Sequence, residues 1–312
     1  MLIESELSNH TRLLILQSTC WYAEIALEVG ANLCRLVHCP TGLDVIRRPK
    51  TYEAFEAAPE CYGIPVLFPP NRIADGRFVF NHREYVLPCN DLNRGNHIHG
   101  VMLRKTWQVI EQTSDRVLLR YELTAEEGYG HDCMLELHYW LDDAGLHQRM
   151  RVTNCSDSVM PIGLGYHTAF TMFPDSRMQA TTVAQYWEIL PPRALPTGRL
   201  LNWHDDVWPC TDLQPVSWHC PMSTGQRHGK SFNRAVITHT DKKLQVVYTV
   251  DQQFKHWYFW NDAGGKGFIC AEPLSWMANA LNMALPIEMT GVQALAPQAT
   301  WSAYTRISVQ AL

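Results

Sequence analysis

The stretch Cys270-Ala271-Glu272-Pro273-Leu274 places a carboxylate at the end of an apolar segment. Residues 268–270 predict a short buried strand that follows a glycine-rich turn at 264–267. Because proline cannot donate to a sheet ladder, we expect this strand to end at Glu272. A carboxylate at the lip of an apolar sheet is either a solvated strand-end residue or, if desolvation raises its pKa, a general base. Its position alone favours the solvated strand-end residue, so other parts of the sequence are needed to distinguish that interpretation from a general base.

The composition is that of a globular protein and argues against several partners. The chain has 312 residues, of which 46% are apolar and 18% charged, and 26 basic against 31 acidic side chains give a net charge of −5. No basic run or stripe is visible, so we expect no nucleic-acid partner. No stretch approaches the roughly 18 apolar residues of a membrane span, so we expect no membrane partner either.

The cysteines and the N-terminus indicate a cellular compartment. The ten cysteines include no Cys-x-x-Cys pair and no zinc-type spacing. Residues 1–6 lack the basic start and the long apolar core of a signal peptide. We therefore expect a reduced, cytoplasmic protein in which the cysteines mostly behave as small apolar residues.

Short alternating segments predict a fold made almost entirely of strands. Residues 77–86 read as a hairpin with Asn81-His82 at its tip, and 51–58 give one of very few helical signals. Residues 174–232 are rich in turns, and we interpret them as excursions over a sheet. The chain is therefore predicted to be all-β, a single domain over 1–312 that forms a large antiparallel β-sandwich with few short helices. Antiparallel strands are expected at 106–112, 116–123, 133–141 and 145–154.

Several segments carry residue types that occur in metal-binding, catalytic or sugar-binding sites. His97 and His99 would face the same way in an extended strand, but no third ligand stands at a helpful spacing, so we expect no metal site. The Pro- and Gly-rich residues 63–73 must be held by packing and would present Arg72 rigidly. His167 interrupts an apolar, glycine-rich stretch, where a core histidine is the commoner finding. Tryptophan often forms the floor of a sugar site, and the chain has 11.

Four of these stretches resemble motifs of the aldose 1-epimerases, the galactose mutarotases, in the same order. Residues 71–78 resemble the family's N-R-I-x-x-G-x-F, and His99-Gly100 its H-G. Residues 165–170 resemble G-x-H-x-x-F, and 272–282 resemble E-P-x-x-x-x-x-N-A-x-N. Each match is weak alone, whereas the ordered set is a strong signal. The resemblance implies a β-sandwich of the galactose mutarotase type that is open to a sugar on one face.

The resemblance also implies a role for individual residues. Glu272 corresponds to the family's general base and His167 to its general acid. Arg72 and His99 correspond to sugar-binding residues, and we add Asn71, which precedes Arg72 in the same motif. An arginine fork suits sugar hydroxyl groups because its donors are fixed in a plane.

The chemistry of anomerisation agrees with these residue types. Converting an α-pyranose into its β form requires removal of the proton of the anomeric hydroxyl group while the ring oxygen O5 is protonated. The C1–O5 bond then opens, the aldehyde end rotates, and the steps reverse. A carboxylate and an imidazolium supply both proton transfers, so neither a cofactor nor a metal is expected. We expect Glu272 and His167 on opposite sides of one pocket.

One departure from the family leaves the substrate open. Members commonly carry a sugar-binding aspartate after the turn-rich region, yet no Asp or Glu stands between Asp212 and Asp241. Asn233 or Lys230 could take that place, and Asp251-Gln252 is a further candidate. A non-catalytic sugar-binding protein and an epimerase of an acidic or phosphorylated hexose therefore remain as alternatives.

A phosphorylated sugar would require Arg72, Arg77 and Lys230 to converge around the phosphate group. In each of these cases we expect the partner to be a small-molecule sugar, and the protein to be a monomer or a homodimer.

Overall fold

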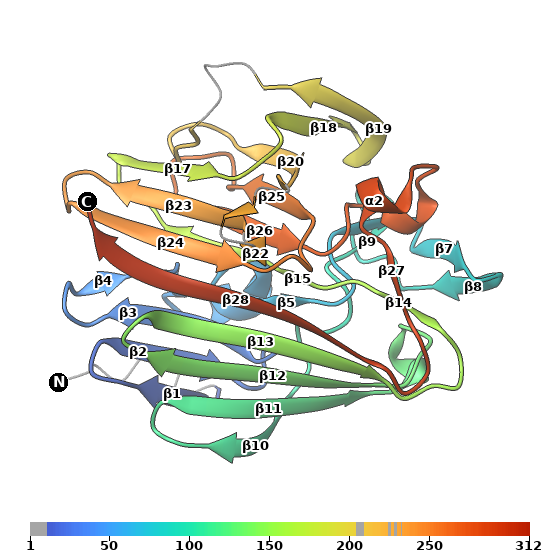
Figure 1. Ribbon diagram of the computed structural model, residues 1–312, viewed down its shortest axis with the longest axis horizontal. Helices are drawn as coiled ribbons and strands as arrows, with labels where there is room; N and C mark the ends of the chain where they lie inside the picture. Colours follow the sequence, from blue (N-terminus) through green and yellow to red (C-terminus); the bar gives the residue numbers. More distant parts are fainter. Residues whose placement is uncertain (1–10, 204–208, 224–225, 228–229, 232) are drawn as a thin grey trace.

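The computed structural model describes residues 11–203, 209–223 and 233–312, together with the backbone of 226–227 and 230–231 (Figure 1). Its framework is two antiparallel sheets that pack face to face, which confirms the predicted all-β architecture. The eight-stranded sheet runs, in spatial order, β10 (Gln108–Gln112), β11 (Arg116–Leu123), β12 (Cys133–Asp142), β13 (Gly145–Asn154), β28 (Thr300–Ala311), β24 (Leu244–Val250), β23 (Asn233–His239) and β17 (Ser176–Ala180). The six-stranded sheet contains β20 (Ser217–Pro221), β25 (His256–Trp260), β26 (Phe268–Leu274), β15 (Gly165–Tyr166) and β5 (Val66–Leu67), with β16 (Thr168–Thr171) pairing with β26.

Smaller elements surround this framework. The N-terminal part forms a four-stranded sheet of β1 (Leu13–Gln17), β2 (Trp21–Ala26), β3 (Asn32–His38) and β4 (Leu43–Asp44). Two-stranded pairs are β6 (Arg72–Ala74) with β9 (Asn96–Ile98), β7 (Arg77–Phe80) with β8 (Arg83–Val86), β14 (Met160–Ile162) with β27 (Gln293–Leu295), β18 (Gln185–Leu190) with β19 (Leu195–Asn202), and β21 (Gln226–Arg227) with β22 (Lys230–Ser231). The short helices are α1 (Tyr52–Ala57), α2 (Ile287–Thr290) and 3-10 turns at Pro59–Cys61, Ala125–Glu127 and Ala280–Asn282.

The alternation of apolar residues explains how the two sheets come together. Leu135, Leu137 and Tyr139 alternate along β12 and are fully buried, as are Phe170 and Ile269 of the opposite sheet. All five belong to one continuous apolar core. Burial of this area is the main favourable term that holds the sheets face to face.

The turn-rich region 174–232 is more regular than the sequence predicted. β17 pairs with β23 as the edge of the eight-stranded sheet, and β20 pairs with β25 as the edge of the six-stranded sheet. Within the described residues, the β18–β19 hairpin fits the predicted excursion; it projects above the sheets in Figure 1. Because turn-forming residues are frequent in this region, the sequence did not predict the short edge strands between them.

The predicted end of the strand at Glu272 is wrong, because β26 continues through Pro273 to Leu274. Its ladder with β15 and β16 pairs Leu274 with Gly165 and Ala271 with Thr168, and it is interrupted between these pairs. Pro273 lies at the interruption, where a missing N–H removes no ladder hydrogen bond. Glu272 is therefore held inside a sheet rather than at its end.

Two further observations concern the predicted state of the cysteines and the predicted absence of a membrane partner. All ten cysteines are free thiols, and five of them are buried. Within the described residues, no helix has the length and apolar character needed to cross a bilayer.

Candidate active site

A cavity of about 350 Å³ opens on the six-stranded sheet beside β25 and β26. Five of the six residues predicted to form the site line it: Asn71, Arg72, His99, His167 and Glu272. They come from four segments that are far apart in the sequence. The fold therefore assembles in one place the four motifs that the sequence showed separately.

His167 and Glu272 meet because they occupy opposed positions on neighbouring strands. Gly165 pairs with Leu274 and Thr168 with Ala271, so this register sets His167 opposite Glu272. Side chains at opposed antiparallel positions are close neighbours on one face of a sheet. His167 Nε2 lies 3.2 Å from Glu272 Oε1. The prediction that the two residues face each other across the pocket is thus wrong: they are in direct contact.

Burial decides the protonation of this pair. Glu272 is 1% exposed and His167 is 4% exposed. Desolvation raises the pKa of the Glu272 carboxyl well above its ordinary value, and the positive charge of Arg72 acts in the opposite direction. Desolvation also lowers the pKa of His167 to about 4. Burial therefore disfavours the charged form of both groups, since it favours the protonated carboxyl of Glu272 and the neutral imidazole of His167.

Arg72 is fixed from both its side chain and its backbone. Its Nε donates to Asp91 Oδ2 at 2.9 Å, and Asp91 also accepts from Arg94 at 3.3 Å. Asn279 N donates to Arg72 O at 2.7 Å, and Asn279 Oδ1 accepts from Ala74 N at 3.0 Å. The asparagine of the fourth motif thus holds the strand that carries Arg72, and Asp91 is a site residue that the sequence analysis missed.

Asn71 and His99 reach the cavity through left-handed backbone. Asn71 has φ +57° and His99 has φ +63°, a region that asparagine and histidine tolerate better than most residues. The turn at His99 breaks the alternation after β9, so His99 lines the cavity whereas His97 Nδ1 contacts Pro88 O at 2.8 Å. The two histidines do not share a face, which corrects the extended-strand expectation. Among the described residues, no group of three or more His, Cys, Asp or Glu is arranged to hold a metal ion.

His99 also contacts the reacting pair. Its ring packs edge to face on His167, with 4.9 Å between ring centroids. Desolvation, followed by the charges of His167 and Arg72, lowers the pKa of His99 well below its ordinary value. Its Nδ1 is buried and has no hydrogen-bond partner among the residues that the structure describes. A neutral His99 can therefore offer a hydrogen bond to a ligand.

Another wall of the cavity comes from β20 and β25. Ser217 and Tyr258 line it, with 3.2 Å between their hydroxyl oxygens, and Trp260 adds a partly exposed aromatic face. Tyr258 and Trp260 are two positions apart on β25, which pairs with the strand that carries Glu272, a long-range pairing that the sequence did not predict.

Asn233 does not line this cavity. Its Oδ1 accepts from Thr181 Oγ1 at 2.8 Å and from Ser223 Oγ at 3.4 Å, and the residue lines a separate cavity. Asn233 begins β23 of the eight-stranded sheet, where its side chain meets Thr181 and Ser223 rather than the residues around Glu272. The side chain of Lys230 falls outside the described residues.

Comparison with known proteins agrees with this geometry. The sequence profile of the family described as aldose 1-epimerase matches residues 21–308. The uncharacterized protein YihR of Escherichia coli K12 is 28% identical over 279 residues, which cover 85% of either chain. YphB of the same organism is 31% identical over 117 residues, 38% of this chain and 39% of that protein.

Solved structures give the same fold. A galactose mutarotase-like protein from Clostridium acetobutylicum superimposes with a TM-score of 0.89 at 28% identity, covering 97% of this chain and 96% of that one. Galactose 1-epimerase from Lactobacillus acidophilus NCFM superimposes with a TM-score of 0.73 at 15% identity, covering 96% and 94%, and supports the fold alone. On the profile match over most of its length, this chain belongs to the aldose 1-epimerase family.

Proposed function

We propose that this protein is an aldose 1-epimerase that interconverts the α and β anomers of a free sugar through the His167–Glu272 pair. The observation that carries the proposal is this buried, contacting acid and base on the floor of a sugar-sized cavity. O1 and O5 of a pyranose are bonded to the same carbon, C1. Two groups in direct contact can therefore exchange protons with both oxygens, Glu272 with O1 and His167 with O5.

One proton in the pair is sufficient for the reaction. In the form with a carboxylate and an imidazolium, Glu272 accepts the proton of the O1 hydroxyl while His167 donates its proton to O5. The C1–O5 bond breaks as the C1=O double bond forms, which gives the open-chain aldehyde. After rotation about C1–C2, the reverse transfers close the ring on the other face of C1 and restore the original pair.

The remaining residues bind and orient the sugar. Arg72, held by Asp91, presents guanidinium donors to hydroxyl groups and favours the ionised form of Glu272. Trp260 offers an aromatic face for the apolar side of the ring, and Ser217 and Tyr258 offer hydroxyl groups. The family aspartate that is missing from the sequence is thus replaced by neutral groups on this wall.

The structure offers little for a phosphorylated substrate. Arg72 is neutralised by Asp91, and Arg77 pairs with Glu84 on the exposed β7–β8 hairpin away from the cavity lining. Arg94 is 45% exposed at its side chain and lines the cavity, so a sugar with an acidic substituent belongs in the substrate panel.

The test is an anomerisation assay by NMR or polarimetry on freshly dissolved α-anomers of neutral, acidic and phosphorylated sugars. We expect at least one sugar to equilibrate faster than in buffer alone. Saturable binding without acceleration across the panel would make the protein a sugar-binding protein and overturn the proposal.

A further inference from the structure

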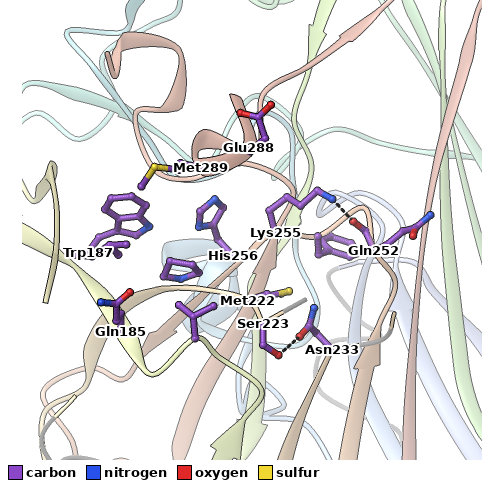
Figure 2. A pocket seen from close by; sticks show the side chains of 14 residues that line it. Gln185, Trp187, Met222, Ser223, Asn233, Gln252, Lys255, His256, Glu288 and Met289 are labelled. Carbon is purple, nitrogen blue, oxygen red and sulfur yellow. Dashed lines mark hydrogen bonds between the residues drawn. The ribbon is translucent and has the colours of Figure 1, made fainter. Parts of the chain in front are cut away.

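A second cavity, of about 450 Å³, lies outside the active pocket, and Figure 2 shows the side chains that line it. His256 lines this cavity and Tyr258 lines the active pocket; because they are two positions apart on β25, they face the same way. The β18–β19 hairpin contributes Trp187, and α2 contributes Met289. No residue of this cavity takes part in the proposed reaction.

The cavity contains buried polar atoms without partners. His256 is 1% exposed, and neither of its ring nitrogens has a hydrogen-bond partner within the described part of the chain; the same holds for Trp187 Nε1. Desolvation lowers the pKa of His256 to about 3, and the carbonyls of Met289 and Thr290 offset this shift only partly. Neither carbonyl meets the geometry of a hydrogen bond to the His256 ring. The ring is therefore neutral, with one donor and one acceptor. Unpaired buried polar groups cost roughly 1–3 kcal/mol each, a cost that a ligand with hydroxyl groups would relieve.

The charges around this cavity exclude a strongly anionic ligand. Lys255 and Glu288 contribute one charge of each sign, and Lys255 Nζ donates to Gln252 O at 2.7 Å. The other polar groups are neutral: the amides of Gln185, Gln252 and Asn233 and the hydroxyl of Ser223. Such a lining has no cluster of cations for a phosphate or carboxylate.

Aromatic and sulfur-containing side chains form the rest of the lining. Trp187 and Phe254 supply aromatic surface, and Met222 and Met289 supply adaptable apolar surface. A ring with an apolar C–H face and neutral hydroxyl groups matches this combination. We propose that the cavity is a second, non-catalytic binding site for a neutral saccharide unit, held on Trp187 and hydrogen-bonded to His256.

The two cavities can be observed separately in one sample. Trp187 reports on the second cavity and Trp260 on the active pocket. Incorporation of 5-fluorotryptophan gives each indole its own fluorine NMR signal, and Trp187→Phe and Trp260→Phe assign the two reporters. Methyl β-glucopyranoside, methyl β-galactopyranoside and maltose are the neutral probes, and glucose 6-phosphate and glucuronate are the charged ones. A methyl glycoside cannot open its ring, so turnover does not interfere.

We expect at least one neutral probe to shift the Trp187 signal with saturation below about 50 mM, and the charged probes to bind at least about tenfold more weakly. Glu272→Gln should leave this response unchanged, which separates the second site from the proposed reaction. No saturable shift of the Trp187 signal, or equal binding of charged and neutral probes, would overturn the proposal.

His256→Phe tests the unpartnered nitrogens directly. The substitution keeps a planar ring of similar size and removes unpaired polar atoms, so the variant should fold. Because one hydrogen bond to the ligand is lost, the affinity for the neutral probe should fall by about tenfold. Gln252→Ala, at an exposed position of the lining, gives a second variant that should weaken binding without disturbing the core. Unchanged affinity in both variants would show that these groups do not recognise a ligand.

Discussion

His167 Nε2 lies 3.2 Å from Glu272 Oε1, although the two residues are 105 positions apart, because the antiparallel register of β15–β16 with β26 sets them opposite each other. The contact makes them one titrating unit rather than two independent groups. Each consequence for activity follows from the single proton that this unit holds.

Removing either partner should abolish most of the catalysed anomerisation. Glu272→Gln cannot accept the O1 proton, and His167→Asn cannot donate to O5, so each should lower kcat by about 10²–10⁴-fold. Polarimetry with the best sugar of the panel measures the effect. The double variant should be little worse than either single one, since the groups act together. Full rate in both single variants would contradict the assigned roles.

The rate should fall in acid. With the pKa of His167 lowered to about 4 and that of Glu272 raised, both groups carry protons only below about pH 4, where no base remains. We expect kcat/KM, corrected for the buffer reaction at each pH, to fall as the pH drops through about 4. An acid limb near pH 6.5, the ordinary value for histidine, would show that His167 is not desolvated during turnover.

Asp91 should act by positioning Arg72. Asp91→Asn keeps the size of the side chain but weakens its charged contact with the Arg72 guanidinium. We expect KM to rise and kcat/KM to fall about tenfold, with a smaller change in kcat. Glu84→Gln is the matched control, because it disrupts the exposed Arg77 ion pair far from the cavity lining. Equal changes in KM and kcat/KM for Asp91→Asn and Glu84→Gln would contradict the positioning role of Asp91.

Asn279 should couple the fourth motif to the first. It adopts φ +58° and hydrogen-bonds the backbone of Arg72 and Ala74. Asn279→Gly tolerates the left-handed backbone but loses the side-chain bond, so it should cost about 1–2 kcal/mol of unfolding free energy and raise KM. Urea denaturation and the anomerisation assay measure both. Asn81→Gly, at an exposed left-handed position in the tip of the β7–β8 hairpin, should leave KM unchanged.

Acid should destabilise the fold before the carboxylates titrate. Burial lowers the pKa of His256 to about 3 and those of His131 and His167 to about 4, so between these values and 6.5 the unfolded chain binds more protons than the folded one. Unfolding free energy therefore rises with pH through this window and is lost as the pH falls. The raised pKa values of Glu272, Asp251 and Glu60 oppose the trend, whereas the lowered pKa values of His97, His99 and His219 add to it.

Calorimetry should show a Tm at pH 4.5 that is at least about 5 °C below the value at pH 7. His256→Phe should reduce this difference, because it removes one of the groups that must be protonated on unfolding. A Tm that does not change over this range would contradict the neutral state of the buried histidines.

The sequence by itself determined the strand-rich fold and most of the site residues. Alternating apolar positions mark the long strands, since their period is local, and Arg72, His99, His167 and Glu272 stand in ordered motifs that require no knowledge of contacts. The same reasoning placed Asn233 in the active pocket, where the structure does not put it.

Only the tertiary structure decided which groups meet. The direct contact of His167 with Glu272 depends on strand register, and the salt bridge from Asp91 to Arg72 joins two separate segments of the chain. Asn233 and Trp260 line two different cavities, a separation that long-range packing sets. Register and sheet order arise from long-range pairing, and a one-residue shift in register would turn every side chain of a strand to the opposite face. Local sequence patterns specify strands and candidate residues, whereas the long-range packing of those strands creates the site.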